Sequence, residues 1–121
     1  MSFDPKDLLL LDEASEVHIE TKRADGRSHR TIIWIVVDEG EVFVRSVRGQ
    51  SGKWYQRARA EPEVVIHAGG RQIPAKAHLA ADEDSVERTN AALRRKYRPG
   101  GSLNSMLRPE THDTTMRLDP V

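Results

Sequence analysis

The 121-residue sequence contains no cysteine, and aromatic residues make up only 5% of it. The absence of cysteine excludes disulfide bonds, thiolate catalysis and cysteine-ligated zinc, and it fits a reducing cytoplasmic compartment. The scarcity of aromatic residues disfavours an oligonucleotide-binding barrel, in which bases stack on exposed rings. No apolar run approaches the roughly 20 residues that span a bilayer. We therefore expect neither a membrane nor a nucleic-acid partner.

The chain also lacks an excess of charge of either sign, because it has 19 basic and 19 acidic residues. This balance argues against general polyanion binding, so any electrostatic function must be local. The length predicts a single domain over residues 1–121. The four-leucine run near the N-terminus is flanked by acidic residues. A secretory signal has a basic start and a longer apolar core, so we expect a cytoplasmic protein.

Hydrophobic periodicity predicts six strands. Val17, Ile19 and Thr21 alternate with polar residues, which is typical of a half-buried strand, and an Asp-Gly pair then supplies a hairpin turn. Residues 31–37 are apolar on both faces, which indicates a strand inside a barrel or at a subunit interface. The remaining strands are expected over residues 41–47, over 63–70 and 71–80 around a Gly-Gly turn, and over 114–118.

Three helices are expected between or beside these strands. The first begins with Asp4 as its N-cap and Pro5 at its first position, and the second runs from Lys53 to about Ala60. The third covers residues 82–97, where acidic residues at the start and basic residues at the end suit the helix dipole. Together the elements indicate a mainly β, α+β barrel with one inserted helix and one longer C-terminal helix.

The segment of residues 44–62 concentrates positive charge in a chain of zero formal net charge. Its two glycines let backbone amides turn towards a ligand, and its lysine lies at the start of a helix, which together favour an anion site. The spacing is not that of a Walker loop, so a nucleoside triphosphatase is disfavoured. The five cations are Arg45, Arg48, Lys53, Arg57 and Arg59.

A purely structural interpretation of the same segment is equally open from local chemistry. In that interpretation Ser51 caps the helix, while Trp54 and Ala58 pack on the barrel. The arginines then form a solvated face, as runs of charge usually do.

The order of the motifs resembles the split-barrel superfamily of flavin- and deazaflavin-dependent oxidoreductases related to pyridoxamine phosphate oxidase. A Gly-Arg turn, a strand entered through threonine, a hairpin and a strand ending in serine occur in DGRSHRTIIWIVVDEGEVFVRS. A glycine loop, Trp-Tyr, an Ala-x-Pro stop and a strand pair with a glycine hairpin follow in GQSGKWYQRARAEPEVVIHAGGRQIPAKAHL. The nearest pattern is the deazaflavin-dependent nitroreductase-type branch, or a related family of small uncharacterised domains. The similarity covers about residues 16–97 and the final strand.

The resemblance implies a six-stranded split β-barrel homodimer that binds FMN or a deazaflavin coenzyme along the barrel at the dimer interface. The serine that ends the third strand and the loop before Trp-Tyr would hold the phosphate. The cofactor would carry hydride to or from an unidentified small molecule. The matching cofactor-binding residues are Thr31, Arg45, Ser46, Arg48, Ser51, Gly52, Lys53, Trp54 and Tyr55.

No catalytic acid or base is identified from the sequence. Tyr55 and Tyr97 are proton-donor candidates, although tyrosine is more often an amphipathic residue at the edge of a core. The five histidines share no metal-ligand spacing, so no metal site is predicted, although some split barrels hold haem through a histidine. Two other hypotheses are a non-catalytic cofactor-binding protein of the same fold and, least favoured, an oligonucleotide-binding barrel.

Overall fold

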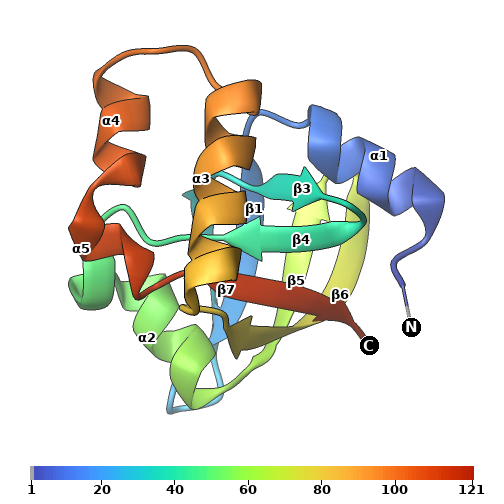
Figure 1. The fold of residues 1–121 in the computed structure, drawn as a ribbon. Coiled ribbons are helices and arrows are strands. Elements are labelled where there is room, and N and C mark those ends of the chain that lie inside the picture. Colours follow the sequence, from blue (N-terminus) through green and yellow to red (C-terminus); the bar gives the residue numbers. More distant parts are fainter. Residues whose placement is uncertain (1) are drawn as a thin grey trace.

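The computed structural model describes residues 2–121 and contains one curled antiparallel sheet with helices packed around it (Figure 1). The strand order is β2-β1-β5-β6-β7-β4-β3. This half-barrel is a split-barrel architecture, but it has seven strands and not the predicted six. The strands are β1 (Val17–Lys22), β2 (Ser28–Ile33), β3 (Val36–Asp38), β4 (Glu41–Val44), β5 (Glu63–Ala68), β6 (Arg71–Leu79) and β7 (Met116–Pro120).

The three predicted helices are present, and three further helical elements are additional to them. The Asp4 carboxylate accepts from Lys6 N at 2.8 Å and caps the first helix, as predicted. None of the helices described in residues 2–121 combines the length and apolar character needed to cross a bilayer. The elements are α1 (Pro5–Glu13), the 3₁₀ turn η1 (Gly49–Ser51), α2 (Lys53–Ala60), α3 (Glu83–Lys96), α4 (Gly101–Leu107) and α5 (Pro109–His112).

The seventh strand arises because residues 31–37 do not form one continuous strand. β2 and β3 lie at opposite edges of the sheet, and the chain turns from one edge to the other between them. At this break, Lys96 Nζ donates to the Ile35 carbonyl at 2.6 Å and the Ile35 amide donates to Tyr97 Oη at 3.4 Å. These side chains replace the strand pairing that Ile35 loses. The prediction of one strand over residues 31–37 is therefore wrong, and Ile32, which is 56% exposed, is not covered within the chain.

Two apolar clusters fix the helices to the sheet. The larger fills the barrel and includes Leu11 of α1 and Trp54 of α2. The smaller packs Leu93 of α3 and Met106 of α4 against Phe43, on the outer side of β4. Each such buried side chain contributes about 1.5–3 kcal/mol to folding. These two clusters therefore hold the start of α2 on one side of the chain that leaves β4 and hold α4 on the other.

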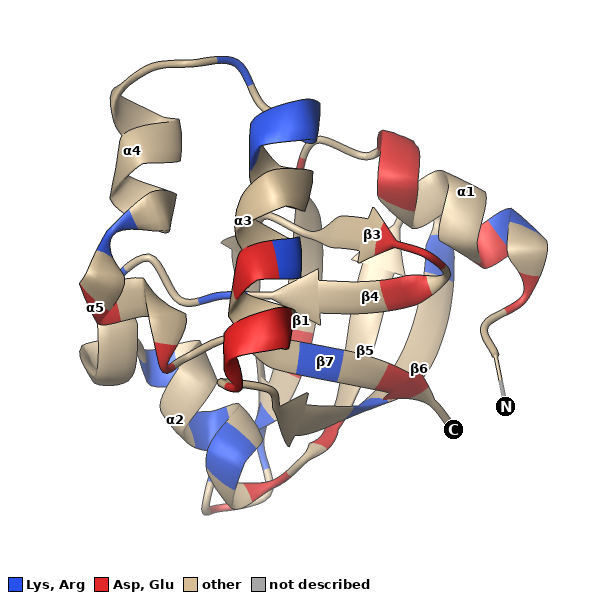
Figure 2. Cartoon of the chain, viewed as in Figure 1, with Lys and Arg blue, Asp and Glu red and all other residues tan. Residues whose placement is uncertain are grey.

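The charged residues of α3 are distributed unevenly along the helix. Figure 2 shows acidic residues at the start of α3 and basic residues at its end, which is the order that the helix dipole favours. Asp82 accepts from Ser85 N at 3.0 Å and caps this helix, which confirms the predicted start of α3.

Candidate functional site

A cleft of about 590 Å³ lies where β2, the chain leaving β4, the start of α2 and α4 meet. Seven of the nine residues predicted to bind a cofactor line it, although they come from three separate elements of the fold. These seven are Thr31, Arg45, Ser46, Arg48, Gly52, Lys53 and Trp54.

Ser51 and Tyr55, the other two predicted residues, do not line the cleft. Ser51 Oγ donates to the Arg48 carbonyl at 2.8 Å within the 3₁₀ turn. The N-cap of α2 is Gly52, with no side-chain capping bond, so the predicted capping by Ser51 is wrong. Tyr55 is buried in the barrel core, and its hydroxyl accepts from Arg59 Nη1 at 2.8 Å.

The turn into α2 is tight enough to require glycine. β4 ends at Val44, two residues earlier than the predicted serine end, and the Ser46 hydroxyl donates to the Gly49 carbonyl at 2.8 Å. A Cβ on Gly52 would lie 2.2 Å from Ser46 Oγ, a contact that no side chain can make without displacement. Gln56 N donates to the Gly52 carbonyl, so the amides of the first turn precede the helical hydrogen-bond ladder.

Arg45 forms the floor of the cleft. Its side chain is only 2% exposed, and its Nε donates to Thr115 Oγ1 at 3.0 Å. Its Nη1 donates to Asn90 Oδ1 at 2.6 Å and to the Met106 carbonyl at 3.2 Å, while Nη2 donates to the Val86 carbonyl at 3.3 Å. Every acceptor is neutral, and burial lowers the pKa of Arg45 to about 10. The guanidinium joins the chain that follows β4 to α3, to α4 and to Thr115, which directly precedes β7, and brings an unneutralised charge to the cleft.

The other cations of the cleft are equally free of carboxylate partners. Arg57 Nε donates to Thr21 Oγ1 at 2.8 Å, and its pKa is lowered, first by burial and then by the charge of Arg23. No ion pair within residues 2–121 involves any of the four cations that line the cleft. These four cations are Arg45, Arg48, Lys53 and Arg57.

Several lining residues were not predicted from the sequence. Trp34, Glu16 and His29 line the cleft, as do Ser105 and Met106 of α4. A lone tryptophan in an apolar run and single polar residues beside a hairpin carry no spacing signal. The α4 residues could be found only by knowing that this helix packs over the end of β4.

Neither predicted tyrosine donor reaches the cleft. Tyr97 Oη donates to the Ser15 carbonyl at 2.7 Å, and burial raises the pKa of Tyr97 to about 12. Tyr55 is held in the core, as described above. Within residues 2–121, no group of three or more histidine, aspartate or glutamate side chains is arranged to hold a metal ion.

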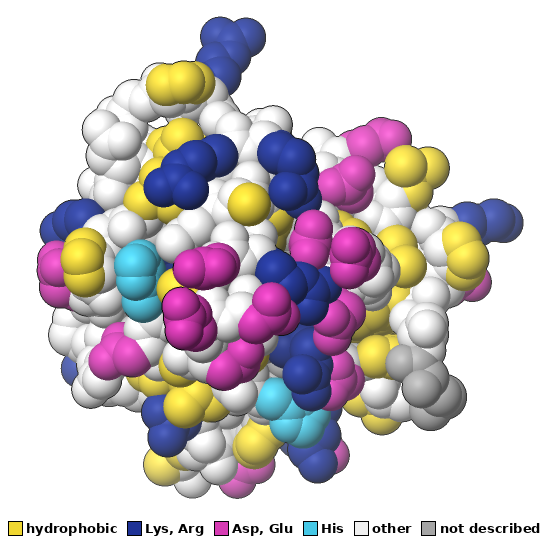
Figure 3. Space-filling model, viewed as in Figure 1, with side chains coloured by type: hydrophobic (Ala, Val, Ile, Leu, Met, Phe, Trp, Pro, Cys, Tyr) yellow, Lys and Arg dark blue, Asp and Glu magenta, His cyan; other side chains and the backbone are white. Residues whose placement is uncertain are grey.

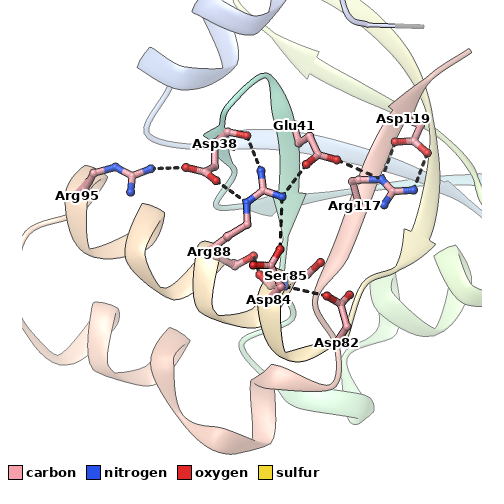
Figure 4. A network of polar contacts seen from close by, with 10 residues as sticks. Asp38, Glu41, Asp82, Asp84, Ser85, Arg88, Arg95, Arg117 and Asp119 are labelled. Atoms are coloured by element: carbon pink, nitrogen blue, oxygen red, sulfur yellow. Dashed lines mark hydrogen bonds and ion pairs between the residues drawn. The ribbon is translucent and has the colours of Figure 1, made fainter.

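The face of the molecule that carries α3 provides a contrast to the cleft, since arginines of α3 and β7 are paired there with carboxylates of β3, β4 and β7 (Figure 4). Arg88 donates to Asp38 Oδ2 and to Glu41 Oε1, both at 2.6 Å. Arg95 contacts Asp38 at 3.0 Å, and Arg117 contacts Glu41 at 3.9 Å. The hydrogen bond from Arg88 is the main cause of the lowered pKa of Asp38. Figure 3 shows acidic and basic side chains intermixed over this face.

Comparison with known proteins places the chain in a family. Residues 7–118 match the model of DUF2255, described as uncharacterized proteins conserved in bacteria. The chain belongs to the DUF2255 family. No curated protein matches this DUF2255 chain.

Solved structures similar to this DUF2255 protein share the split-barrel fold at low sequence identity. A candidate pyridoxamine 5'-phosphate oxidase from Listeria innocua has a TM-score of 0.68 and 17% identity, over 95% of this chain and 90% of its own. An F420-H2-dependent reductase has a TM-score of 0.66 and 18% identity, over 87% and 94%. HutZ, a haem storage protein from Vibrio cholerae, has a TM-score of 0.71 and 15% identity, over 100% and 92%. These similarities confirm the predicted split-barrel fold.

Proposed function

We propose that the cleft binds a phosphate-bearing flavin-type cofactor, FMN or a deazaflavin coenzyme. We further propose that the protein is an oxidoreductase that transfers hydride between this cofactor and a small molecule. The observation that carries the proposal is that four cations line the cleft without a carboxylate partner in the described residues. Because unpaired like charges repel and lose hydration on burial, their gathering around a hollow favours an anionic ligand.

The donors at the start of α2 suit a phosphate group. Lys53 and the free amides of the first turn offer charge-assisted hydrogen bonds at a helix N-terminus. Gly52 has no side chain that would block the approach to these amides. Arg57 lies one turn further along the same helix and also lines the cleft.

The remainder of the cleft suits an aromatic ring system. Ile33, Trp34, Trp54 and Met106 give it an apolar lining, as small-molecule sites generally have. The cleft follows β2 from His29 onwards, and four strand residues span roughly 13 Å. An extended ligand with a ring at one end and a phosphate at the other therefore matches both its length and its polarity.

A bound flavin or deazaflavin would supply the hydride-transfer chemistry. The residues of this chain would hold the phosphate, surround the ring and limit access of water. Binding without turnover is a second candidate function, because neither tyrosine reaches the cleft. Apart from lysine and arginine, the titratable side chains that line it are Glu16 and His29.

The proposed assembly is a homodimer that covers the apolar rim of the cleft. Ile32 and Val47 both line the cleft and are 56% and 43% exposed. Covering them with a second copy would remove apolar surface from water and close the open side of the cleft. Light scattering at micromolar concentration is expected to give twice the chain mass, and a monomer mass would contradict the dimer.

Fluorescence titration with FMN and riboflavin, which differ only by the phosphate, tests the proposed cofactor site. Lys53→Ala is expected to weaken FMN binding about tenfold to a hundredfold, because one charge-assisted contact is lost. Riboflavin binding and protein stability are expected to stay unchanged, since an exposed lysine contributes little to folding. Lys76→Ala on β6 is the matched control, because this exposed lysine lies outside the cleft.

Equal FMN affinity in wild type and Lys53→Ala would contradict the phosphate assignment. The same titration with flavin adenine dinucleotide and the deazaflavin coenzyme identifies the preferred cofactor. The bound cofactor loses its visible absorption when it is reduced. Recovery of this absorption on addition of a panel of acceptors then distinguishes an oxidoreductase from a binding protein.

A further inference from the structure

Trp34 lies at the break between β2 and β3 and is held flat against Tyr97. The two ring centroids are 3.8 Å apart and the ring planes are inclined by 6°. Trp34 lines the cleft, whereas Tyr97 does not. Tyr97 therefore covers one face of the indole, while another part of the indole surface lines the cleft.

The neighbouring backbone holds this indole in place. Lys96 Nζ donates to the Ile35 carbonyl at 2.6 Å and to the Leu11 carbonyl at 2.9 Å. Tyr97 Oη donates to the Ser15 carbonyl and so fixes the supporting ring. An aromatic surface that is ordered before a ligand arrives loses little freedom on binding, which favours affinity.

Glu16 is the only carboxylate among the residues that line the cleft. It precedes β1, and the register of β1 with β2 pairs Val17 with Ile33, so Glu16 is brought close to Trp34. Its charge also contributes to the raised pKa of Tyr97, after the larger effect of burial. No ion pair or side-chain hydrogen bond of Glu16 occurs within residues 2–121. Its oxygens are therefore free acceptors beside an aromatic surface.

The two ends of the cleft differ in chemistry. Arg57 is bonded to Thr21, which pairs with His29 at the far end of β2 from Trp34. The Arg57 charge thus lies towards one end of β2, and Trp34 with Glu16 lies towards the other. A ring that stacks on Trp34 would prefer an offset face-to-face arrangement, and an N–H on its edge would donate to Glu16.

We propose that Trp34 and Glu16 form a ring subsite, which takes a flat nitrogen heteroaromatic with an N–H on its edge. This inference rests on the proposed function, because it assigns the ring of the proposed cofactor to this end of the cleft. A separate aromatic substrate with the same chemistry is the other source of such a ring. Trp34 also packs against the second core cluster, so a purely structural role for the stacked pair is the competing explanation.

Tryptophan fluorescence tests the subsite directly, because the chain has only two tryptophans, Trp34 and Trp54. The variant Trp54→Phe leaves Trp34 as the reporter. The probe is lumichrome, an alloxazine that has the three fused rings of a flavin and N–H groups at N1 and N3 but no sugar chain and no phosphate. We expect lumichrome to quench Trp34 saturably. In wild type, Trp34→Leu is expected to weaken lumichrome binding about tenfold, and Trp34→Phe less.

Glu16→Gln separates recognition of the ring edge from stacking. We expect the substitution to weaken lumichrome about threefold to tenfold and to leave its N1,N3-dimethylated form unchanged, since that form has no N–H to donate. Lys53→Ala is expected to leave both probes unaffected. Circular dichroism of each variant checks the fold, and Trp34→Phe keeps the test valid if Trp34→Leu does not fold.

The outcomes for the subsite and for the phosphate site are distinguishable. If FMN binds in a Lys53-dependent way while lumichrome leaves Trp34 fluorescence unchanged, the ring subsite is wrong and the proposed cofactor site stands. If lumichrome binds at Trp34 but FMN binds no more tightly, the phosphate site is wrong and the ring subsite stands. Displacement of lumichrome by FMN assigns the subsite to the cofactor ring, and simultaneous binding assigns it to a separate aromatic substrate.

Discussion

Arg45 and Arg88 are both held against α3, and only one of them is neutralised. Arg88 has two carboxylates at 2.6 Å, and hydrogen bonds to Asp38 and then Glu41 raise its pKa above the usual value. Arg45 has only neutral acceptors, and burial lowers its pKa. A neutralised charge contributes to the fold alone. The charge of Arg45 is balanced by nothing in the described chain, so it remains available to an anion in the cleft.

Removing each arginine is expected to give the largest effect. Arg45→Met should lower the free energy of unfolding by about 3–5 kcal/mol, because four buried or partly buried acceptors lose their donor. Arg88→Met should lower it by only about 1 kcal/mol, since its partners are partly exposed to solvent. Urea denaturation measures both. Equal losses would contradict the distinction between a buried structural cation and a surface network.

A carboxylate partner for Arg45 would neutralise its charge, as Asp38 and Glu41 neutralise the charge of Arg88. Asn90 Oδ1 accepts from Arg45 Nη1 at 2.6 Å, so Asn90→Asp places a negative charge there with almost no change in shape. FMN affinity is expected to fall about tenfold while riboflavin affinity and the free energy of unfolding are retained. Fluorescence titration measures the two affinities. An unchanged FMN affinity would show that the charge of Arg45 is not felt in the cleft.

Lys96, like Arg45, is a cation whose hydrogen-bond acceptors are neutral, and its expected effect is the smallest. Burial lowers its pKa from 10.5 to about 8, opposed by the charge of Asp12. Between these two values the unfolded chain binds more protons than the folded one, so the free energy of unfolding should rise with pH. The neutral amine still has two N–H donors for its two carbonyls. The rise should be modest because Lys96 is only half-buried.

Thermal unfolding of wild type and Lys96→Gln between pH 7 and pH 10 measures this contribution. The stability advantage of wild type over the variant is expected to grow across that range. An advantage that shrinks with rising pH would contradict the lowered pKa. Lys76→Gln serves as the control for the loss of an exposed lysine.

The regular elements were predictable because their signals are local. The alternation of Val17 and Ile19 identified β1, the capping residue Asp4 identified the start of α1, and acidic residues identified the start of α3. The break between β2 and β3 was not predictable, because the groups that satisfy Ile35 come from Lys96 and Tyr97, more than 60 positions away. Apolar periodicity alone cannot distinguish such a corner from a buried strand.

The cleft residues that could be predicted are those in the sequence motifs that resemble the split-barrel family. The segment from Arg45 to Trp54 supplied six of the seven predicted residues that line it. Trp34 and Glu16 were missed because their roles depend on strand register and on the Tyr97 ring. Ser51 was misassigned because a serine before a helix usually caps it, whereas here Gly52 is the N-cap.

Binding of a phosphate-bearing cofactor in the cleft is tested most directly by hydrogen exchange across residues 48–55. If FMN or the deazaflavin coenzyme binds there, exchange in this segment should slow. The protein should also be stabilised by about 2.7 kcal/mol at a hundredfold excess over the dissociation constant. Free phosphate should have a weak effect, because it lacks the ring contacts. If FMN, flavin adenine dinucleotide and the deazaflavin coenzyme all leave exchange and melting temperature unchanged, the cleft is not a cofactor site.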